Sequence, residues 1–410
     1  MRVKPSKLEG SVKAIPSKSF AHRALICAAI SDGVSQIIFD KTSDDIDATI
    51  NCLRTLGAKI EKFESGVRVK GISKLDNIPI VDSKESGSTF RFLLPLASTI
   101  YGQVIFIGEG RLPNRPIKDL MDVMKHRGVE FDSECLPFKT NGLLSPGRYE
   151  ISGDVSSQYV SGLLFAALNL NGGSEVIVNT NLESKSYVDI TVEVMRAFGA
   201  DIIEKGNSFL VNESKLKARS YNVEGDWSNS SFLLVAGAFG KVSVNGLNKE
   251  SSQGDKQILK ILEDFGAEVV ISDEVIVASR DRNPIDVDLK DIPDMLPILS
   301  ILAASVDGGV SRFYNASRLR LKESDRIKST ADLITSLGGK VEERDDELLI
   351  YGTNGLAGGI VDSHNDHRIV MAAAIASTIS ENDIVIKNSK AINKSYPTFF
   401  DDFADLGGKI

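Results

Sequence analysis

The chain has 410 residues, of which 42% are hydrophobic and 25% are charged. This is the composition of a globular protein with two or three domain-sized cores, and it excludes disordered and fibrous classes. The formal net charge of -8 leaves no overall positive field to attract nucleic acid or anionic lipid, so any binding of anions must be local.

Cysteine usage and hydropathy indicate a cytoplasmic protein. The three cysteines, Cys27, Cys52 and Cys135, lie far apart and not in Cys-x-x-Cys spacing, which argues against a disulfide framework or a zinc site. The N-terminus has no charged start followed by an apolar core, and no apolar stretch reaches the roughly 20 residues that span a membrane. A reducing compartment therefore fits best.

One short pattern recurs in chain order, at intervals of about 70 residues. It consists of the end of an amphipathic helix, a glycine and the start of a strand. Because the apolar residues before each glycine follow a helical period, the glycine is expected just after the helix in a left-handed conformation. The pattern then predicts a second strand, a short polar cluster and a small apolar helix. The six glycines are Gly57, Gly128, Gly199, Gly266, Gly338 and Gly407.

The repeats predict two α/β domains of three units each. The opening segment, residues 2–19, matches the second half of a unit, and the chain ends as the sixth unit begins its strand. We therefore expect the N-terminus to complete the sixth unit. This gives a discontinuous domain, residues 1–14 plus 224–410, and an inserted domain, residues 15–223.

The second helix of every unit is expected to begin with hydroxyl, amide or charged residues and to continue with small apolar ones. Ser, Asp and Asn at such positions are explained by ordinary N-capping. The openings, in chain order, are residues 17–19, 85–89, 156–158, 228–231, 291–294 and 364–367.

Capping does not explain the cations near these openings and on neighbouring segments. A helix N-terminus already carries partial positive charge, so a cation there costs about 0.3 to 1 kcal/mol unless an anion is expected. Several such helix ends facing one cleft would bind phosphate and carboxylate groups. The cations are Lys18, Arg23, Arg91, Arg115, Lys322, Arg326, Arg368 and Lys394.

A set of motifs runs in order from residue 16 to Lys394. The motifs are Pro16–Arg23, Gly87–Arg91, Asn114–Ile117, Ser156–Gln158, Ser184–Tyr187, Ile292–Asp294, Lys322–Arg326 and Asn365–Arg368. With them the chain resembles the 5-enolpyruvylshikimate-3-phosphate (EPSP) synthases of the enolpyruvyl transferase superfamily. The resemblance implies a two-domain inside-out α/β barrel of six βαβαββ units, three per domain, with the active site in the cleft between the domains.

The resemblance also implies the activity. The enolpyruvyl (1-carboxyvinyl) group of phosphoenolpyruvate would pass to the 5-hydroxyl of shikimate 3-phosphate by addition and elimination, on the shikimate pathway to chorismate and the aromatic amino acids. The expected partners are these two small molecules, with no cofactor, metal, nucleic acid or membrane, and the protein is expected to be a monomer.

The site residues follow from the same resemblance, position by position. The shikimate 3-phosphate shell would contain Lys18, Ser19, Arg23, Ser156, Ser157, Gln158, Ser184, Asp294 and Lys322. The phosphoenolpyruvate shell would contain Lys18, Gly87, Arg115, Gln158, Arg326, Arg368 and Lys394.

The reaction needs a base and an acid close together. Asp294, at a helix start and surrounded by cations, is expected to stay ionised and to accept the hydroxyl proton. Glu323 and Lys18 are the candidates for moving protons at the enol carbon and the bridging oxygen, with Lys394 in reserve. The arginines would stabilise the departing phosphate.

Two positions depart from the family pattern. Glu85 stands where members often have Asn, and we expect its carboxylate to point away from substrate or to pair with a cation. Arg318 stands where some members have an amide that touches the ring of the substrate, so it is left out of the predicted site.

Alternative interpretations remain for some of these residues. Asp294 could be an N-cap, and residues 322–326 could be a solvated helix face with i,i+4 pairs. Asp362, His364, Asp366 and His367 could bind a metal ion, although no Cys or further His supports a closed site.

Two other functions compete with the expected one. The sister enzymes that use UDP-N-acetylglucosamine usually carry a Cys acid in the loop that corresponds to residues 108–114, and this chain has none there. A sliding clamp on DNA is also acidic and built from repeats, but it does not need the Asp294 and Glu323 constellation.

Overall fold

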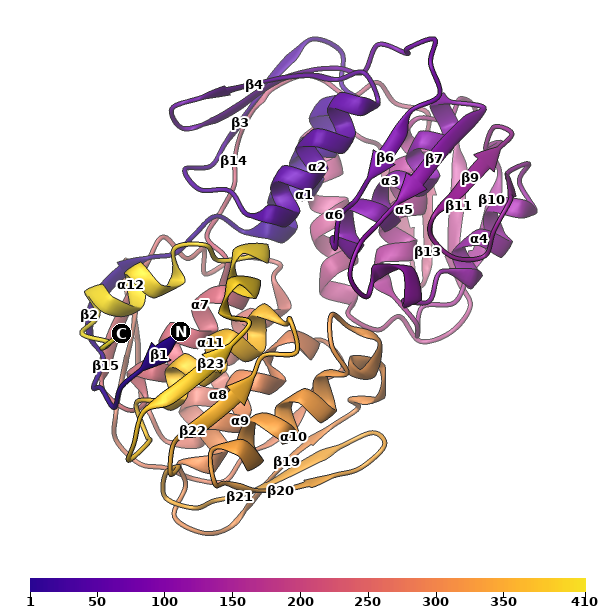
Figure 1. Ribbon diagram of the computed structural model, residues 1–410. Coiled ribbons are helices and arrows are strands. Elements are labelled where there is room, and N and C mark those ends of the chain that lie inside the picture. The colour runs from indigo at the N-terminus through magenta and orange to yellow at the C-terminus, as the bar shows by residue number, and fades with distance from the viewer. The chain divides into compact units, whose positions relative to one another are not determined.

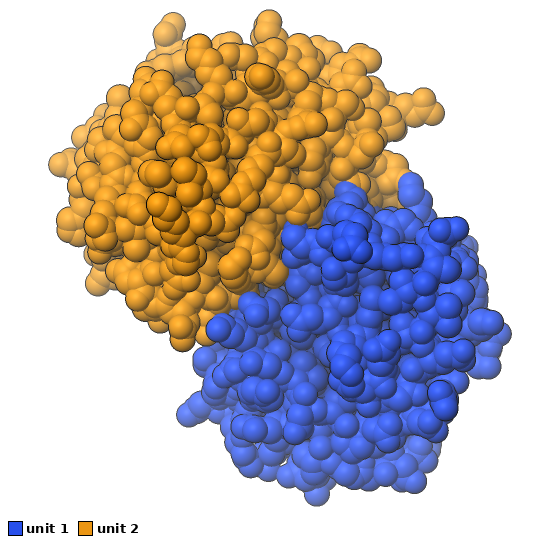
Figure 2. Space-filling view, turned by 180° about the vertical axis from the view of Figure 1, so that it is seen from behind, with its two compact units in different colours: residues 1–15, 224–410 blue, residues 16–223 orange.

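The computed structural model describes residues 1–410, and the chain divides into two compact units (Figure 2). Unit 1 comprises Met1–Ile15 and Glu224–Ile410, and unit 2 comprises Pro16–Val223. The division therefore falls after residues 15 and 223, whereas the repeats placed it after residues 14 and 223. Each unit carries its own hydrophobic core.

Unit 2 is built from three four-stranded sheets and six helices. Each sheet contains one parallel pair and two antiparallel pairs. The strand order of the first sheet is β14(Ser220–Asn222), β3(Val34–Ile38), β5(Gly66–Lys70), β4(Lys59–Phe63). The order of the second sheet is β6(Ile80–Asp82), β7(Gln103–Ile107), β9(Phe138–Asn141), β8(Glu130–Phe131). The order of the third sheet is β10(Arg148–Ile151), β11(Ser174–Val178), β13(Ser208–Val211), β12(Ile202–Lys205). The helices are α1(Lys18–Ala29), α2(Asp44–Thr55), α3(Gly87–Ile100), α4(Lys118–Lys125), α5(Ser157–Leu168) and α6(Lys185–Ala197), with the 3₁₀ turn η1(Leu112–Asn114).

Unit 1 follows the same plan, except that one of its sheets has three strands (Figure 1). Its sheets have the orders β16(Glu268–Ile271), β17(Glu274–Ala278), β15(Lys241–Asn245), β2(Glu9–Lys13); β18(Asp286–Asp288), β19(Val310–Tyr314), β21(Leu348–Tyr351), β20(Lys340–Glu343); and β1(Arg2–Val3), β23(Ile384–Lys387), β22(Gly359–Asp362). The helices are α7(Trp227–Gly237), α8(Ile258–Phe265), α9(Leu296–Ala304), α10(Arg326–Ser336), α11(His367–Ala376) and α12(Phe399–Asp405). The 3₁₀ turns are η2(Gly254–Gln257), η3(Pro293–Met295), η4(Ser317–Leu321) and η5(Ser389–Lys394).

The six repeat glycines lie where the sequence pattern predicts them. Each follows a helix with a φ between 83° and 104°, a left-handed conformation that glycine adopts without steric cost. The predicted repeat of helix, glycine and strand is therefore confirmed.

The N-terminus completes the sixth unit, as the repeats predict. Strand β1 pairs antiparallel with β23, which pairs parallel with β22. An isolated bridge joins Lys4 to Lys409. The first strand of the chain therefore joins the sheet of the sixth unit, and residues close to the two ends of the chain pair with each other.

Two strands belong to one unit although the helix that follows each of them along the chain belongs to the other unit. Strand β2 leads into α1 of unit 2, but it pairs in parallel with β15 of unit 1. Strand β14 leads into α7 of unit 1, but it pairs in parallel with β3 of unit 2. In the other units, for example β6 and β7 around α3, the strand before the helix pairs with the strand after it.

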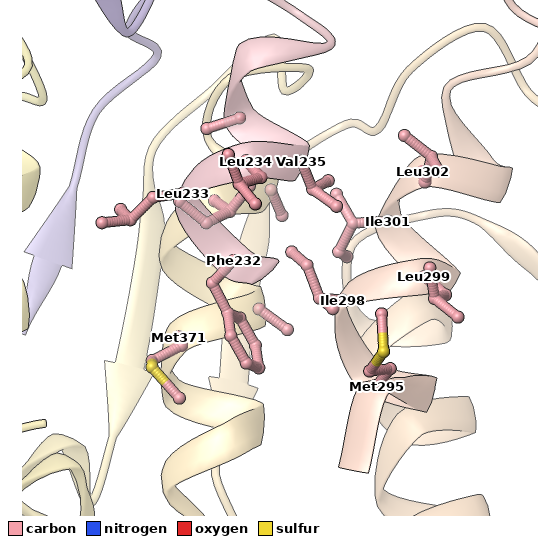
Figure 3. Packing of buried hydrophobic residues seen from close by; sticks show 14 of the residues in the cluster. Phe232, Leu233, Leu234, Val235, Met295, Ile298, Leu299, Ile301, Leu302 and Met371 are labelled. Atoms are coloured by element: carbon pink, nitrogen blue, oxygen red, sulfur yellow. The ribbon is translucent and has the colours of Figure 1, made fainter. Parts of the chain in front are cut away.

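The helices that open with the polar clusters lie inside the units, and the sheets lie outside. Every residue of α7, α9 and α11 is buried, whereas β19 alternates exposed and buried residues. In Figure 3 the side chains of Phe232, Ile298 and Met371, one from each of these helices, point toward one another. A buried helix of this kind presents polar groups only at its ends, which is where the predicted site residues lie. None of the helices has both the length and the apolar character needed to cross a membrane.

Candidate active site

Five of the six inner helices begin with a side-chain cap. The hydroxyls of Ser17, Ser86 and Ser156 accept hydrogen bonds from backbone N–H groups of α1, α3 and α5, and the carboxylates of Asp226 and Asp366 do the same for α7 and α11. Each cap satisfies one N–H group of the first turn and leaves others available. Capping and anion binding are therefore compatible at these helix starts.

Lys18 is the first residue of α1, and its cation has an acidic partner. Its Nζ donates to Oδ2 of Asp45 at 2.7 Å, in the first turn of α2. The carboxylate of Asp45 offsets the cost of a cation at a helix start, so the position of Lys18 does not by itself require a bound anion. Nothing in the sequence pattern indicated that residues 27 positions apart would meet.

Gly87, the first residue of α3, lies directly against Arg115. A Cβ atom built on Gly87 would be 2.7 Å from Nη1 of Arg115. Arg115 is only 9% exposed and follows η1. The guanidinium therefore lies over the start of α3, in a position that requires glycine at residue 87. Glu85 does not face Gly87: its Oε2 would be 2.4 Å from a Cβ built on Gly110.

A polar network joins the starts of α3 and α5. Nη1 of Arg91 donates to Oε1 of Gln158 at 2.7 Å, and Nε2 of Gln158 donates to the hydroxyl of Ser88 at 2.8 Å. Arg91 also donates to the carbonyl of Pro116 at 3.1 Å. Arg91 is absent from the predicted site, although it lies in one of the recognised motifs, and here it orients Gln158.

Arg23 is buried and bonded to the protein. Its Nε donates to the hydroxyl of Thr191 at 2.7 Å, Nη1 to the carbonyl of Ser19 at 2.8 Å and Nη2 to the carbonyl of Tyr187 at 2.8 Å. These bonds tie the start of α1 to the start of α6, where Ser184 has a left-handed backbone with φ 52°. In this structure Arg23 acts on the predicted substrate shell by holding Ser19 and the segment after Ser184.

Asp294 is the centre of an ion-pair network in unit 1. Its Oδ1 lies 2.6 Å from Nη1 of Arg326 and 3.8 Å from Nζ of Lys322, and its Oδ2 lies 3.2 Å from Nη2 of Arg368. The N-cap alternative for Asp294 is wrong, since it lies within η3 and α9 begins at Leu296 without a side-chain cap. Arg326 and Arg368 are 32 and 74 residues away from Asp294 along the chain, so the fold brings them together.

The charges in this network change the proton affinities of its members. Burial by itself raises the pKa of Asp294, but the charges of Arg368, Lys322 and Arg326 outweigh it and hold the pKa far below its ordinary value. Burial lowers the pKa of Lys322 to about 8, against the attraction of Asp294. Asp294 is therefore ionised, and Lys322 is a cation that titrates just above neutrality.

Arg326 holds three carboxylates. Its guanidinium contacts Asp294, Oε2 of Glu323 at 2.7 Å and Oδ2 of Asp366 at 3.0 Å. Arg326 is 1% exposed, and the hydroxyl of Ser324 donates to Asp366 at 2.9 Å. The alternative of a solvated helix face for residues 322–326 is therefore wrong. Asp366 is a further member of this network that was not among the predicted site residues, although it lies in the motif Asn365–Arg368.

The remaining candidates of unit 1 flank this network. Nζ of Lys394 donates to the carbonyl of Asn365 at 2.7 Å, just before α11. Arg318 donates to the carbonyls of Leu289 and Lys290, in the turn that leads to η3. Arg318 therefore supports the segment that carries Asp294.

The residues of the metal alternative have separate partners. Asp366 binds Arg326, whereas Nε2 of His364 lies 3.3 Å from Oδ2 of Asp332. Asp362 accepts a hydrogen bond from the backbone N–H of His364. His367 is buried at the start of α11.

Asp255, a second buried carboxyl, lies close to this network. It is 4% exposed, on the 3₁₀ turn η2. Burial and the charge of Asp294 together raise its pKa to about 7, against the charge of Arg368, which lowers it. No sequence motif indicated Asp255, because its position depends on how η2 packs against α7.

The predicted site residues thus form one group in each unit. In unit 2 the group lies at the starts of α1, α3, α5 and α6; its members are Lys18, Ser19, Arg23, Gly87, Arg115, Ser156, Ser157, Gln158 and Ser184. In unit 1 it lies around Asp294; its members are Asp294, Lys322, Glu323, Arg326 and Arg368, with Lys394 beside Asn365.

Comparison with known proteins identifies relatives over the whole chain. The sequence model of EPSP synthase (3-phosphoshikimate 1-carboxyvinyltransferase) matches residues 3–403. The 3-phosphoshikimate 1-carboxyvinyltransferase of Clostridium kluyveri is 43% identical over 417 residues, which cover 100% of this chain and 97% of the relative. That of Clostridium botulinum strain Eklund 17B is 41% identical over 423 residues, covering 100% and 98%.

Solved structures share the fold. An EPSP synthase from Acinetobacter baumannii superposes with a TM-score of 0.82 at 24% identity, over 99% of this chain and 97% of that chain. The enolpyruvyl transferase NikO from Streptomyces tendae superposes with a TM-score of 0.80 at 17% identity, over 100% and 97%. The predicted two-domain fold of the enolpyruvyl transferases is therefore confirmed. With a family match over residues 3–403 and relatives above 40% identity, this chain belongs to the EPSP synthase (3-phosphoshikimate 1-carboxyvinyltransferase) family.

Proposed function

We propose that this chain transfers the enolpyruvyl group of phosphoenolpyruvate to the 5-hydroxyl of shikimate 3-phosphate, giving 5-O-(1-carboxyvinyl)-3-phosphoshikimate and phosphate. The observation that carries the proposal is the network of Asp294 with Lys322, Arg326 and Arg368 in unit 1. It combines an ionised carboxylate, which can accept a proton, with three cations that can hold a phosphorylated carboxylic acid.

Phosphoenolpyruvate binds by replacing one carboxylate with another. Asp294 neutralises part of the charge of Arg326 and Arg368 when no ligand is present. Arginine pairs in a bidentate manner with phosphate and carboxylate groups, so an incoming anion competes for these guanidinium groups. As the anion takes over the arginines, Asp294 loses the charges that depress its pKa and becomes a stronger base.

In the addition step, the 5-hydroxyl oxygen forms a bond to C2 of the enol, and its proton passes to Asp294. The π electrons of the enol take a proton at C3, which becomes a methyl group. Glu323, held by Arg326, and Lys18 are the candidate acids for this proton. The product is a tetrahedral intermediate that still carries the phosphate.

In the elimination step, the bond between C2 and the phosphate oxygen breaks, and its electron pair leaves with the phosphate. A proton passes from the methyl group at C3 back to the group that delivered it, Glu323 or Lys18, and its electron pair restores the double bond. Arg115, Arg326, Arg368 and Lys394 stabilise the charge that accumulates on the leaving phosphate. Lys18 can protonate the bridging oxygen.

Shikimate 3-phosphate binds at the helix starts of unit 2. The proposed contacts are Lys18, Ser19, Arg23, Ser156, Ser157, Gln158 and Ser184, with Asp294 and Lys322 from unit 1. The support is the N–H groups of the first helical turn and the serine hydroxyls at the starts of α1 and α5. The active site is thus proposed to take residues from both units.

An assay of phosphate release tests the function. With phosphoenolpyruvate, we expect release that depends on shikimate 3-phosphate and is absent with UDP-N-acetylglucosamine, because residues 108–114 contain no Cys. Release with the nucleotide sugar alone would overturn the proposal. Membership of the EPSP synthase family already excludes the sliding clamp.

We further propose that the enzyme works as a monomer in the cytoplasm. Every proposed site residue belongs to the same chain, and the three cysteines are not spaced as disulfide pairs. Light scattering during gel filtration, in the presence and absence of both substrates, checks the oligomeric state. A dimeric mass under both conditions would contradict the monomer.

A further inference from the structure

A chain of four buried polar side chains crosses unit 2 from α1 to α3. Nδ1 of His22 lies 2.7 Å from the hydroxyl of Thr49, which lies 2.6 Å from the hydroxyl of Thr89. The Thr89 hydroxyl lies 2.8 Å from that of Ser86. All four residues are at most 1% exposed. Since buried polar groups stabilise a fold little compared with apolar groups of the same shape, this chain calls for a functional explanation.

Both ends of the chain lie beside proposed phosphoenolpyruvate ligands. His22 lies one turn after Lys18 on α1. Ser86 caps α3 and immediately precedes Gly87, on which Arg115 rests. This hydrogen-bonded chain of side chains therefore connects α1, which carries Lys18, to α3, whose first residue contacts Arg115.

The two threonines in the middle of this hydrogen-bonded chain lie close to Asp45, the ion-pair partner of Lys18. Thr49 lies one turn after Asp45 on α2, and the Asp45 carboxylate binds Nζ of Lys18 at 2.7 Å. The Thr89 hydroxyl also lies 3.4 Å from the backbone carbonyl of Asp45. A displacement of α2 relative to α3 would consequently move the Lys18 ammonium relative to Arg115.

His22 takes part in this chain as a neutral group. Burial, together with the charges of Lys18 and Arg23, lowers the pKa of His22 well below its ordinary value. Its second ring nitrogen, Nε2, is buried and makes no hydrogen bond. The hydrogen bond to Thr49 is therefore the polar interaction of this side chain. The neutral imidazole orients the Thr49 hydroxyl and adds no charge.

We propose that Thr49 is a positioning residue for phosphoenolpyruvate, because its hydroxyl links α1 to α3 and thereby fixes Lys18 with respect to Arg115. The inference rests on the proposed function, and it adds a residue that contacts neither substrate. It assigns to the hydroxyl chain a larger effect on phosphoenolpyruvate than on shikimate 3-phosphate, since both Lys18 and Arg115 are ligands of phosphoenolpyruvate in that function and only Lys18 is also a ligand of shikimate 3-phosphate.

Thr49→Val tests the inference, because valine keeps the shape of threonine and removes both hydrogen bonds. We expect the KM for phosphoenolpyruvate to rise about tenfold, the order expected when one buried hydrogen bond is lost, and the KM for shikimate 3-phosphate, to which Lys18 contributes without Arg115, to rise clearly less. Thr49→Ser retains the hydroxyl and is expected to restore the KM. Thr140→Val is the matched control: Thr140 is buried in the same unit and donates to a strand carbonyl.

A purely structural role would give a different result. Equal changes in both KM values, or a rise in the KM for phosphoenolpyruvate no larger than that of Thr140→Val, would overturn the inference. If Thr49→Val fails to fold, His22→Leu breaks the neighbouring link, and the same selective rise in KM decides the question. Absence of phosphate release by the wild-type enzyme would refute the proposed function itself, so the two failures are distinguishable.

Discussion

In the proposed mechanism, Asp294 is a weak base in the free protein and becomes a stronger base when phosphoenolpyruvate is bound. Three cations surround its carboxylate, which makes it a weak base in the free protein. The same cations are the proposed ligands of phosphoenolpyruvate. Binding of the anion and activation of the base are therefore coupled through one set of ion pairs.

Replacement of Asp294 by asparagine should remove the base and leave the shape of the site. We expect Asp294→Asn to lower kcat by roughly 10²- to 10⁴-fold, the range of general base catalysis, with both substrates still bound. Arg326 remains paired with Glu323 and Asp366, so the fold should persist. Steady-state kinetics with Asp286→Asn, an exposed aspartate on β18, as the control checks this. A near-normal kcat would show that another group takes the proton.

Lys322 should make substrate binding sensitive to pH just above neutrality. Its pKa is lowered from the ordinary value to about 8, so the ammonium is charged below pH 8 and neutral above it. We expect the KM for shikimate 3-phosphate to be flat from pH 6.5 to 7.5 and to rise above pH 8, by up to about tenfold per pH unit.

The rise in the KM for shikimate 3-phosphate is due to Lys322 if it disappears when residue 322 carries a permanent positive charge. In Lys322→Arg, whose guanidinium stays protonated, the KM for shikimate 3-phosphate should have no inflection near pH 8, whatever its absolute value. An inflection that persists in Lys322→Arg would assign the titration to a different group.

At the scale of single elements, the start of α3 has no room for a side chain. Gly87→Ala would place a Cβ 2.7 Å from Nη1 and 3.1 Å from Cζ of Arg115, closer than atoms pack. The buried guanidinium must move, and we expect the KM for phosphoenolpyruvate to rise about tenfold, as for one lost charge-assisted contact.

The control for this substitution lies two residues beyond the other end of the same helix. A Cβ on Gly102 would meet no atom within 4 Å, so Gly102→Ala should leave both KM values unchanged. Thermal unfolding of both variants shows whether the fold is intact. An unchanged KM for phosphoenolpyruvate in Gly87→Ala would mean that Arg115 does not bind this substrate.

The repeats could be read from the sequence because local chemistry determines them. A glycine after each helix adopts a positive φ that other residues avoid, and this signal needs no knowledge of the partner strand. The same is true of the side-chain caps at Ser17, Ser86 and Ser156.

Features that depend on tertiary contacts could not be read in this way. The pairing of β2 with β15 and of β14 with β3 joins segments more than 180 residues apart, for example Gln36 and Ser220. The ion pairs of Lys18 with Asp45 and of Arg326 with Asp366 span 27 and 40 residues. The cations therefore looked uncompensated in the sequence, although the folded chain provides carboxylates for them.

At the scale of the whole molecule, the proposed function divides its site residues between the two units. Unit 2 supplies helix starts with hydroxyls, amides and the cations Lys18 and Arg115; unit 1 supplies Asp294 with its arginines. Neither group contains both the proposed base and the full set of ligands for two anionic substrates. The account therefore requires residues of both units to act on the same pair of molecules.

A crystal structure of Asp294→Asn with both substrates bound tests this requirement most directly. The account predicts that Lys18 and Arg115 of unit 2 and Lys322 and Arg368 of unit 1 all lie within hydrogen-bonding distance, about 2.7 to 3.2 Å, of a single pair of bound ligands. Ligands that contact the residues of only one unit, or that occupy two separate surfaces, would contradict it.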